Sequence, residues 1–413
     1  MHVLPTDRFK TFAVSAYIGR PLQPDTVTAT ALVPFILQRG TERYPKTKAF
    51  QEQLDSLYGA GFGFDIYKRG NNHIVQYRMD TVDDKYVGDE AEGLLSETLT
   101  FLLDALTKPA LEDGTFVDQY VTAEKQTVSK KLMAIINDKI RYAAERCTQE
   151  MFKQDPFRVN ALGDYREHEQ LDAQSLYNVY REWLATAQID LYVVGRTNLE
   201  QVTQIVDAQF QHERKQAAHY EIRPFRRSSS TAINTIVERL DVSQGKLNMG
   251  LSAPFTYDDE RYPAAMMYNG IFGGYPHSRL FINVREKASL AYYASSALDG
   301  FKGSMMIQSG IEVTNYDKAV GIIREQLDAM RDGEIGETEL AQTKAMITNK
   351  LRQIVDSPYE MIAFDFSSVI SGAKRPLAQF IEQIESVEAS DVRQVAREIE
   401  LDTIYFLTDQ KGG

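Results

Sequence analysis

The sequence predicts an α+β protein made of two homologous halves, each an antiparallel sheet covered by helices on one face. Two observations carry this prediction. The order strand, strand, helix, long helix, helix and strand occurs twice along the 413 residues. In both halves the two alternating strands follow each other through a short turn, so they are antiparallel neighbours. The helices that come after them have to cover one face of that sheet.

The strand pairs are recognised by their alternation of apolar and polar residues. Residues 57–78 predict two aromatic-rich strands with a turn at residues 69–72. Residues 290–313 predict two more, with a turn at residues 299–303. A period of two residues indicates strands that bury one side and leave the other side polar.

Helices follow each strand pair at corresponding positions. Leucines at helical spacing over residues 95–106 predict an amphipathic helix, and the apolar residues over 320–330 predict its counterpart in the second half. A Lys-Leu pair then heads a predicted long helix in each half, at residues 131–132 and 350–351. Each half ends with a charged helix and a short strand, which we place at residues 189–194 and 403–407.

Self-similarity supports a duplication. Residues 84–88 read DKYVG and residues 317–321 read DKAVG, an offset of 233, whereas the two Lys-Leu pairs are 219 residues apart. The difference of 14 residues indicates additional chain in the first half, around residues 108–116. Residues 212–230 are polar, basic and Ser-rich, which is typical of a connector. We therefore expect a first half at 1–215, a linker at 216–232 and a second half at 233–413.

Composition and charge exclude several classes of protein. A formal net charge of −12 disfavours a nucleic-acid partner. The longest apolar run, residues 31–37, is far shorter than the roughly 20 residues that span a membrane. Charged residues interrupt the N-terminal stretch where a signal peptide keeps its apolar block, and the single cysteine, Cys147, forms no internal disulfide. We expect a cytoplasmic protein that binds neither nucleic acid nor membrane.

Residues 272–296 contain a spaced motif: S-R-L-F at 278–281, Arg-Glu at 285–286 and Leu-Ala-Tyr at 290–292. This stretch resembles the second-half signature of the insulinase/pitrilysin family of zinc metallopeptidases, which includes the mitochondrial processing peptidases and bacterial relatives. The resemblance extends over nearly the whole chain, because that family also has two homologous halves. It implies the family's metallopeptidase (LuxS-like) fold, in which the halves form a clam-shell around a cleft.

The zinc-binding motif of the family is not present in this sequence. Active relatives carry H-x-x-E-H on a helix shortly before a Gly-Thr pair; the two His bind zinc and the Glu activates water. With Gly40-Thr41 as the reference, the two His positions are occupied by Ala31 and Phe35, and the general-base position by Pro34. The resemblance therefore implies a chain without catalytic residues, metal or cofactor of its own.

The third zinc ligand of active relatives is the second acid of an E-x6-E motif. Here Glu124 occupies the first acidic position, and Lys131 occupies the ligand position. An ammonium group repels a divalent cation, so this substitution also argues against a metal site. The six histidines offer no replacement, because none is three or four residues from another. We expect all six at the surface or in turns.

The resemblance assigns Arg285 and Tyr292 to substrate binding, since this pair holds the backbone of the substrate peptide in relatives. A guanidinium and a phenol can both donate to a carbonyl oxygen. The alternative is an ion pair between Arg285 and Glu286 or Asp299, with Tyr292 as an ordinary strand aromatic.

Residues 135–147 form a charged helix segment with two open interpretations. It could contact a partner, or it could be a solvated helix face with Tyr142 packed inward. Cys147 lies near Glu145 and Glu150 in this segment. Carboxylates raise the pKa of a thiol, which disfavours a nucleophilic role.

The sequence as a whole looks most like the inactive peptidase-like proteins of Gram-positive bacteria. We therefore expect a non-catalytic subunit that binds peptide and assembles with a zinc-bearing homologue into a processing protease. One alternative is a self-sufficient zinc-dependent endopeptidase that acts as a homodimer through an unrecognised site. A further alternative is a pure structural scaffold.

Overall fold

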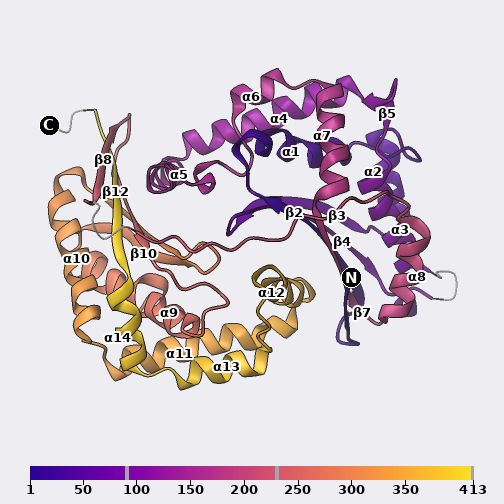
Figure 1. Cartoon of the computed structure of the whole chain (residues 1–413). Coiled ribbons are helices and arrows are strands. Elements are labelled where there is room, and N and C mark those ends of the chain that lie inside the picture. Colours follow the sequence, from indigo (N-terminus) through magenta and orange to yellow (C-terminus); the bar gives the residue numbers. More distant parts are fainter. Residues whose placement is uncertain (89–92, 228–231, 411–413) are drawn as a thin grey trace. The chain divides into compact units, whose positions relative to one another are not determined.

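Two five-stranded sheets organise the chain in the computed structural model, which describes residues 1–88, 93–227 and 232–410 (Figure 1). The first sheet has the order β1-β7-β2-β4-β3 and the second has the order β10-β11-β9-β12-β8. The strands of the first sheet are β1 (His2–Pro5), β2 (Thr11–Pro21), β3 (Gly61–Arg69), β4 (Asn72–Val82) and β7 (Gln188–Gly195). The second-sheet strands are β8 (Asn234–Arg239), β9 (Gly245–Ser252), β10 (Ala291–Asp299), β11 (Ser304–Ile311) and β12 (Glu400–Thr408).

The two sheets repeat one topology. A hairpin forms one edge (β3-β4 or β10-β11), and an antiparallel central strand follows it. The opposite edge strand, β1 or β8, pairs in parallel with its neighbour. The predicted α+β class, the duplication and both predicted hairpins are confirmed. The sequence pattern missed the strands that begin each half, and with them the parallel edge pair.

Helices account for most of the remaining described chain. Those before residue 215 are α1 (Pro24–Leu37), α2 (Thr47–Ser56), α3 (Leu94–Thr107), α4 (Asp118–Asn137), α5 (Lys139–Met151), α6 (Tyr165–Gln170), α7 (Ala173–Thr186) and α8 (Leu199–Gln209). Those after it are α9 (Tyr262–Asn269), α10 (Tyr316–Asp332), α11 (Glu337–Arg352), α12 (Pro358–Ser371), α13 (Leu377–Ser386) and α14 (Ala389–Glu398). Two π-helical segments, Gly270–Gly274 and Phe281–Lys287, follow α9, and a small hairpin joins β5 (Leu111–Glu112) to β6 (Thr115–Phe116).

The chain packs as two compact units that do not follow chain order. The first unit comprises Met1–Met133, Val159–Tyr220 and Val355–Phe366. The second comprises Ala134–Arg158, Glu221–Ile354 and Ser367–Gly413. Each unit therefore includes a helical segment from the other half of the sequence: α5 belongs to the second unit, and most of α12 belongs to the first. The boundaries expected from the sequence repeat, at residues 215 and 233, refer to the duplicated halves of the sequence and not to these units, and they stay a prediction.

Helix α5 packs against the second sheet. Ala143 and Cys147, both fully buried, share a core cluster with Tyr405 and Leu407 of β12, and Tyr142 packs against that cluster. The side of α5 that faces inward thus contacts a sheet from the other half of the sequence. Tyr142 is packed inward, as one of the two interpretations of residues 135–147 expected.

Residues of α12 pack against the first sheet in the same manner. Phe366 is fully buried and stacks on Tyr17 of β2, with ring centroids 3.7 Å apart. Asp365 accepts a hydrogen bond of 2.9 Å from the Tyr192 hydroxyl of β7. Because side chains alternate along a strand, Tyr17 and Ala16 point to opposite faces. Ala16 lies among α3 and α7 residues, so the α12 segment covers the face of the sheet that those helices leave open.

Candidate functional site

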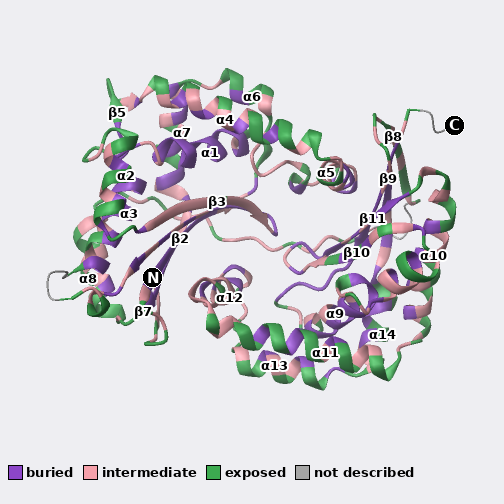
Figure 2. Ribbon diagram, turned by 180° about the vertical axis from the view of Figure 1, so that it is seen from behind, coloured by how far each residue is buried: buried purple, intermediate pink, exposed green. Residues whose placement is uncertain are grey.

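Helix α1, which the resemblance predicts to correspond to the zinc helix of active relatives, lies in the core of the first unit. Every residue from Val27 to Leu37 is buried (Figure 2). A helix that is apolar on all sides is stable only where neighbours enclose it. Ala31 is 0% exposed and Phe35 is 5% exposed. Pro34 lies inside α1 and, having no backbone N–H, removes one hydrogen bond of the helix. The three motif positions on α1 are therefore packing residues.

Lys131, at the position of the third zinc ligand, lies against Phe35. The Lys131 Nζ atom is 5.9 Å from the centroid of the Phe35 ring. The Phe35 ring also meets the Phe64 ring of β3 edge to face, with ring centroids 4.8 Å apart. The structure thus brings together positions 35 and 131, which the resemblance predicts to correspond to two zinc ligands of active relatives. Here they carry an aromatic ring and an ammonium, neither of which coordinates zinc.

Glu124, the acid of the E-x6-E motif that is present here, is a structural residue. Its side chain is 1% exposed, and its carboxylate forms a short, hydrogen-bonded ion pair with Arg39. Arg39 follows the end of α1, so this pair connects α1 with α4. A buried carboxylate needs such a partner, because an unpaired buried charge is strongly unfavourable.

The described residues contain no cluster of three or more His, Cys, Asp or Glu side chains that could hold a metal ion. Two histidines are buried, so the expectation of six surface or turn histidines is wrong for His73 (3% exposed) and His168 (0%). Their Nε2 atoms lie 2.9 Å and 2.8 Å from the carbonyl oxygens of Ala161 and Leu162. Burial lowers the pKa of His73 to about 4, which keeps its ring neutral.

Arg285 lies in the π-helical segment Phe281–Lys287 and is exposed. Its guanidinium carbon is 4.5 Å from the centroid of the Phe281 ring, one turn earlier. Asp299, one of the two acids considered as its ion-pair partner, instead accepts hydrogen bonds from the backbone N–H groups of Phe301 and Lys302. Among the described residues, no ion pair joins Arg285 to either acid. The guanidinium is therefore supported by a ring and open to a ligand.

Tyr292 lies on β10, the edge strand of the second sheet, and is 60% exposed. Its hydroxyl donates to Glu312 Oε1 over 3.1 Å. An exposed aromatic side chain that is held by a hydrogen bond is poorly explained as a core residue. Among the described residues, no hydrogen bond or cation–π contact joins Tyr292 to Arg285, although both belong to the second unit.

The rest of the second-half motif has a packing role. Ser278 and Leu280 are fully buried, and Arg279 pairs with Glu339 of α11 through two hydrogen bonds of 3.0 and 3.1 Å. A Cβ atom on Gly273 would lie 2.6 Å from the backbone nitrogen of Ser296, so this position requires glycine. These contacts fix the segment that carries Arg285. π-Helical turns are frequent at functional sites, and their presence here could not be read from the sequence.

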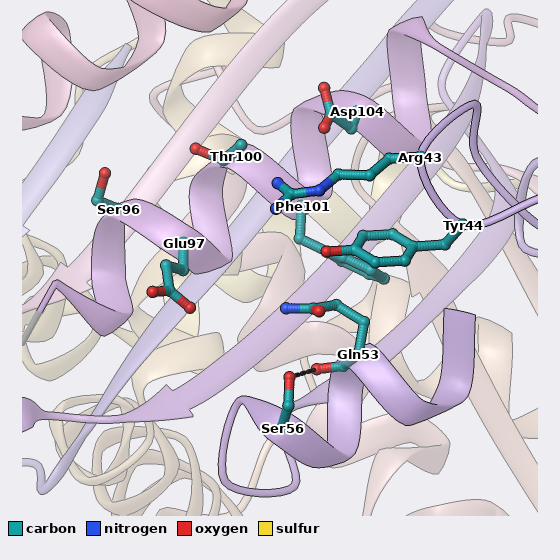
Figure 3. Close-up of a pocket in the computed structure, with 9 residues that line it drawn as sticks. All are labelled: Arg43, Tyr44, Gln53, Ser56, Ser96, Glu97, Thr100, Phe101 and Asp104. Carbon is teal, nitrogen blue, oxygen red and sulfur yellow. Dashed lines mark hydrogen bonds between the residues drawn. The ribbon is translucent and has the colours of Figure 1, made fainter. Parts of the chain in front are cut away.

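A separate polar hollow of about 560 Å³ lies in the first unit (Figure 3). Arg43 and Tyr44 line it from the segment after α1, opposite residues of α2 and α3. The Arg43 guanidinium lies 5.3 Å from the centre of the Tyr44 ring. None of the residues singled out in the sequence lines this hollow. Its side chains come from three separate segments and form no motif.

Comparison with known proteins places these observations in one family. A family model described as "Peptidase M16 inactive domain" matches residues 170–347. The chain is 39% identical over 411 residues to the "Probable inactive metalloprotease YmfF" of Bacillus subtilis, covering 100% of this chain and 96% of that protein.

Solved structures agree with this result. A conserved protein from Enterococcus faecalis matches with a TM-score of 0.92 at 30% identity, over 100% of this chain and 96% of the other. The peptidase M16 inactive domain from Pseudomonas fluorescens matches with a TM-score of 0.81 at 16% identity, over 99% and 96% of the two chains, and so shares the fold. Within the described residues, no helix has the length and apolar character needed to cross a bilayer.

Proposed function

Because this chain belongs to the M16 (insulinase/pitrilysin) family of metallopeptidase-like proteins, in its inactive branch, we propose that it is a non-catalytic subunit that binds peptide beside a zinc-bearing homologue. In this proposal the homologue supplies the metal chemistry, and this chain supplies part of the peptide-binding surface. The pair together acts as a peptide- or protein-processing protease.

One contrast between the two units carries the proposal. The resemblance implies that three positions hold the metal in active relatives and one activates water; here the metal positions carry a methyl group, an aromatic ring and an ammonium, and the water-activating position carries a proline. The two positions that contact substrate in relatives keep their donor groups, and both side chains are exposed. A chain that had become a pure scaffold would have no need for Arg285 and Tyr292 on its surface.

The chemistry of the two side chains suits a peptide backbone. The guanidinium of Arg285 presents several N–H donors in a plane, and the phenol of Tyr292 presents one O–H donor. Both can donate to a substrate carbonyl oxygen, where they would also stabilise negative charge that develops during hydrolysis. Phe281 and Glu312 hold these donors in place before a substrate binds.

The test is reconstitution with a zinc-bearing M16 homologue from the same organism. We expect each protein alone to be weakly active or inactive on an unstructured peptide, and the mixture to be active. Arg285→Ala should lower the activity of the mixture by about tenfold or more, as loss of one such donor does. Lys287→Ala is the matched control, since this exposed cation lies in the same π-helical segment.

Three outcomes would overturn the proposal in different ways. Chelator-sensitive cleavage by the purified chain alone would identify a self-sufficient enzyme. Activation of the homologue that Arg285→Ala and Tyr292→Phe both leave unchanged would favour a scaffold. Absence of any association with a zinc-bearing homologue would contradict the proposed assembly of this chain with such a partner.

A further inference from the structure

A hollow of about 380 Å³ in the second unit is lined by four arginines, which is unusual in a chain of net charge −12. Arg324 and Arg331 lie on α10, Arg397 lies in the last turn of α14, and Arg227 precedes β8. Helix α10 lies alongside α14 in the second unit (Figure 1). We refer to this site as the arginine hollow.

The positive charge of the arginine hollow exceeds the negative charge that lines it. Asp328 and Glu400 are the two carboxylates among the lining residues, so four guanidinium groups and two carboxylates leave an excess of two positive charges. A third carboxylate, Asp402, lies 3.8 Å from Arg227 but outside the lining. Like charges brought this close repel one another, and a bound anion would relieve that repulsion.

Two of the four arginines are held in fixed positions. Arg331 donates to Asp328 over 2.9 Å and to the Ile399 carbonyl oxygen over 2.7 Å, at the junction of α14 and β12. The Arg227 side chain is only 13% exposed and lies 3.8 Å from Glu400. Guanidinium groups that are already ordered lose little side-chain entropy when a ligand binds.

The other two arginines are placed to reach a ligand. Arg324 and Arg397 are both exposed, and neither forms an ion pair with a described carboxylate. Arg324, Asp328 and Arg331 follow the spacing that puts residues on one face of α10. The buried residues Leu327 and Leu401, together with Ile233, add an apolar part to the same lining.

From this arrangement we propose that the arginine hollow binds the phosphate group of a small organic phosphate. A phosphate monoester carries a charge of about −1.5 to −2 at neutral pH, and Arg324 and Arg397, which form no ion pair with a described carboxylate, present positive charge to it. Planar guanidinium groups bind phosphate oxygens through two parallel hydrogen bonds. The apolar residues would contact the organic portion. This site is independent of Arg285 and Tyr292, and its occupancy requires no partner protein.

Isothermal titration of the purified full chain tests the proposal, with inorganic phosphate and phenyl phosphate as probes at low ionic strength. We expect saturable binding with one site per chain, tighter for phenyl phosphate because of the apolar contacts. The double variant Arg324→Ala/Arg397→Ala should weaken binding of phenyl phosphate by roughly tenfold or more, as loss of charged hydrogen bonds does. Arg141→Ala/Arg239→Ala is the matched control, since it removes the same charge from exposed arginines of the same unit.

The variants also separate specific recognition from general electrostatics. Arg324→Lys/Arg397→Lys keeps the charge but loses the planar donors, so we expect affinity between that of the wild type and the alanine variant. Circular dichroism of each variant confirms that the chain is folded. Absence of saturable binding by the wild type would overturn the proposal, as would an equal loss of affinity in the control variant.

Discussion

The Nζ atom of Lys131 lies 5.9 Å from the centre of the Phe35 ring, and the family resemblance predicts that these two positions correspond to ligands of one zinc ion in active relatives. The two residues are 96 positions apart in the sequence and lie on different helices, α4 and α1. Phe35 is 5% exposed and belongs to the core of the first unit, whereas Lys131 is exposed. The contact therefore joins that core to the surface of α4, and neither side chain is a zinc ligand.

Restoring three ligands should restore zinc binding. In the triple variant Ala31→His/Phe35→His/Lys131→Glu, two imidazoles one helical turn apart and one carboxylate face the same point. We expect about one zinc per chain by elemental analysis, against almost none in the wild type. Ala31→His/Phe35→His/Lys130→Glu is the control, because position 130 is also exposed but belongs to another face of α4. A folded triple variant that retains no zinc would contradict the register assigned to these positions.

The buried ammonium of Lys302 should be sensitive to loss of its carboxylate partner. Its side chain is 1% exposed, and its Nζ atom lies 2.7 Å from Asp155 and 5.4 Å from the ring centres of Phe152 and Phe157. Asp155→Asn removes the ion-pair partner of this buried charge, so it should lower the free energy of unfolding by about 3 kcal/mol.

Lys302→Met should be less damaging than Asp155→Asn, because it removes the buried charge and leaves a carboxylate that is 30% exposed to solvent. Urea-induced unfolding measures both variants. Lys215→Met is the control: Lys215 pairs with Glu182, and both side chains are more than half exposed, so we expect less than about 0.5 kcal/mol. The opposite order of the two buried variants would show that packing, not charge, dominates at this site.

Stability of the second unit should fall in acid through Glu238. Burial raises the pKa of this carboxyl, but hydrogen bonds from Tyr142, Arg146 and Tyr405 outweigh burial and hold the pKa below its ordinary value. The unfolded chain then binds a proton more readily than the folded chain. The stabilisation is therefore complete above the ordinary pKa of a glutamate and is lost as the pH falls through the lowered folded value.

Thermal unfolding of the wild type and of Glu238→Gln, measured from pH 7 to pH 3, tests this prediction. The variant should be less stable at pH 7, and the difference between the two proteins should shrink as the pH falls. Asp328→Asn serves as a control for loss of an exposed carboxylate, and we expect its free energy of unfolding at pH 7 to differ from that of the wild type by less than about 1 kcal/mol. A difference that stays constant with pH would contradict the assigned role of the Glu238 charge.

Cys147 should be unreactive in the folded protein. It is fully buried between α5 and the second sheet, and burial is the main reason that its pKa is raised. A thiol reagent should therefore modify it only after denaturation, since the thiolate is the reactive form. Gln126→Cys in a Cys147→Ala background provides an exposed cysteine for comparison. Rapid labelling of native Cys147 would indicate that α5 separates readily from the sheet.

Alternation located both hairpins, because the strand period is set by local backbone geometry and the paired strands are close in sequence. The same pattern missed the strands that begin each half. The correspondence of positions 35 and 131 with zinc ligands came from the family resemblance and stays a prediction.

Sequence periodicity could not predict that α5 belongs to the second unit and that most of α12 belongs to the first. Helix α5 is amphipathic, and its apolar face could be covered by either sheet. Its sequence therefore does not indicate that β12 is the strand it packs against. The burial of His73 and His168 likewise depends on carbonyl groups of the 159–162 segment, and nothing in the sequence around His73 indicates that contact. Long-range packing decides both features.

The most direct test of the central claim is the zinc content and peptidase activity of this chain, of a zinc-bearing homologue and of the complex of the two. The account predicts almost no zinc in this chain, about one zinc per complex, and peptide cleavage by the complex that depends on Arg285. Zinc in this chain at about one per molecule, together with cleavage in the absence of the homologue, would contradict it.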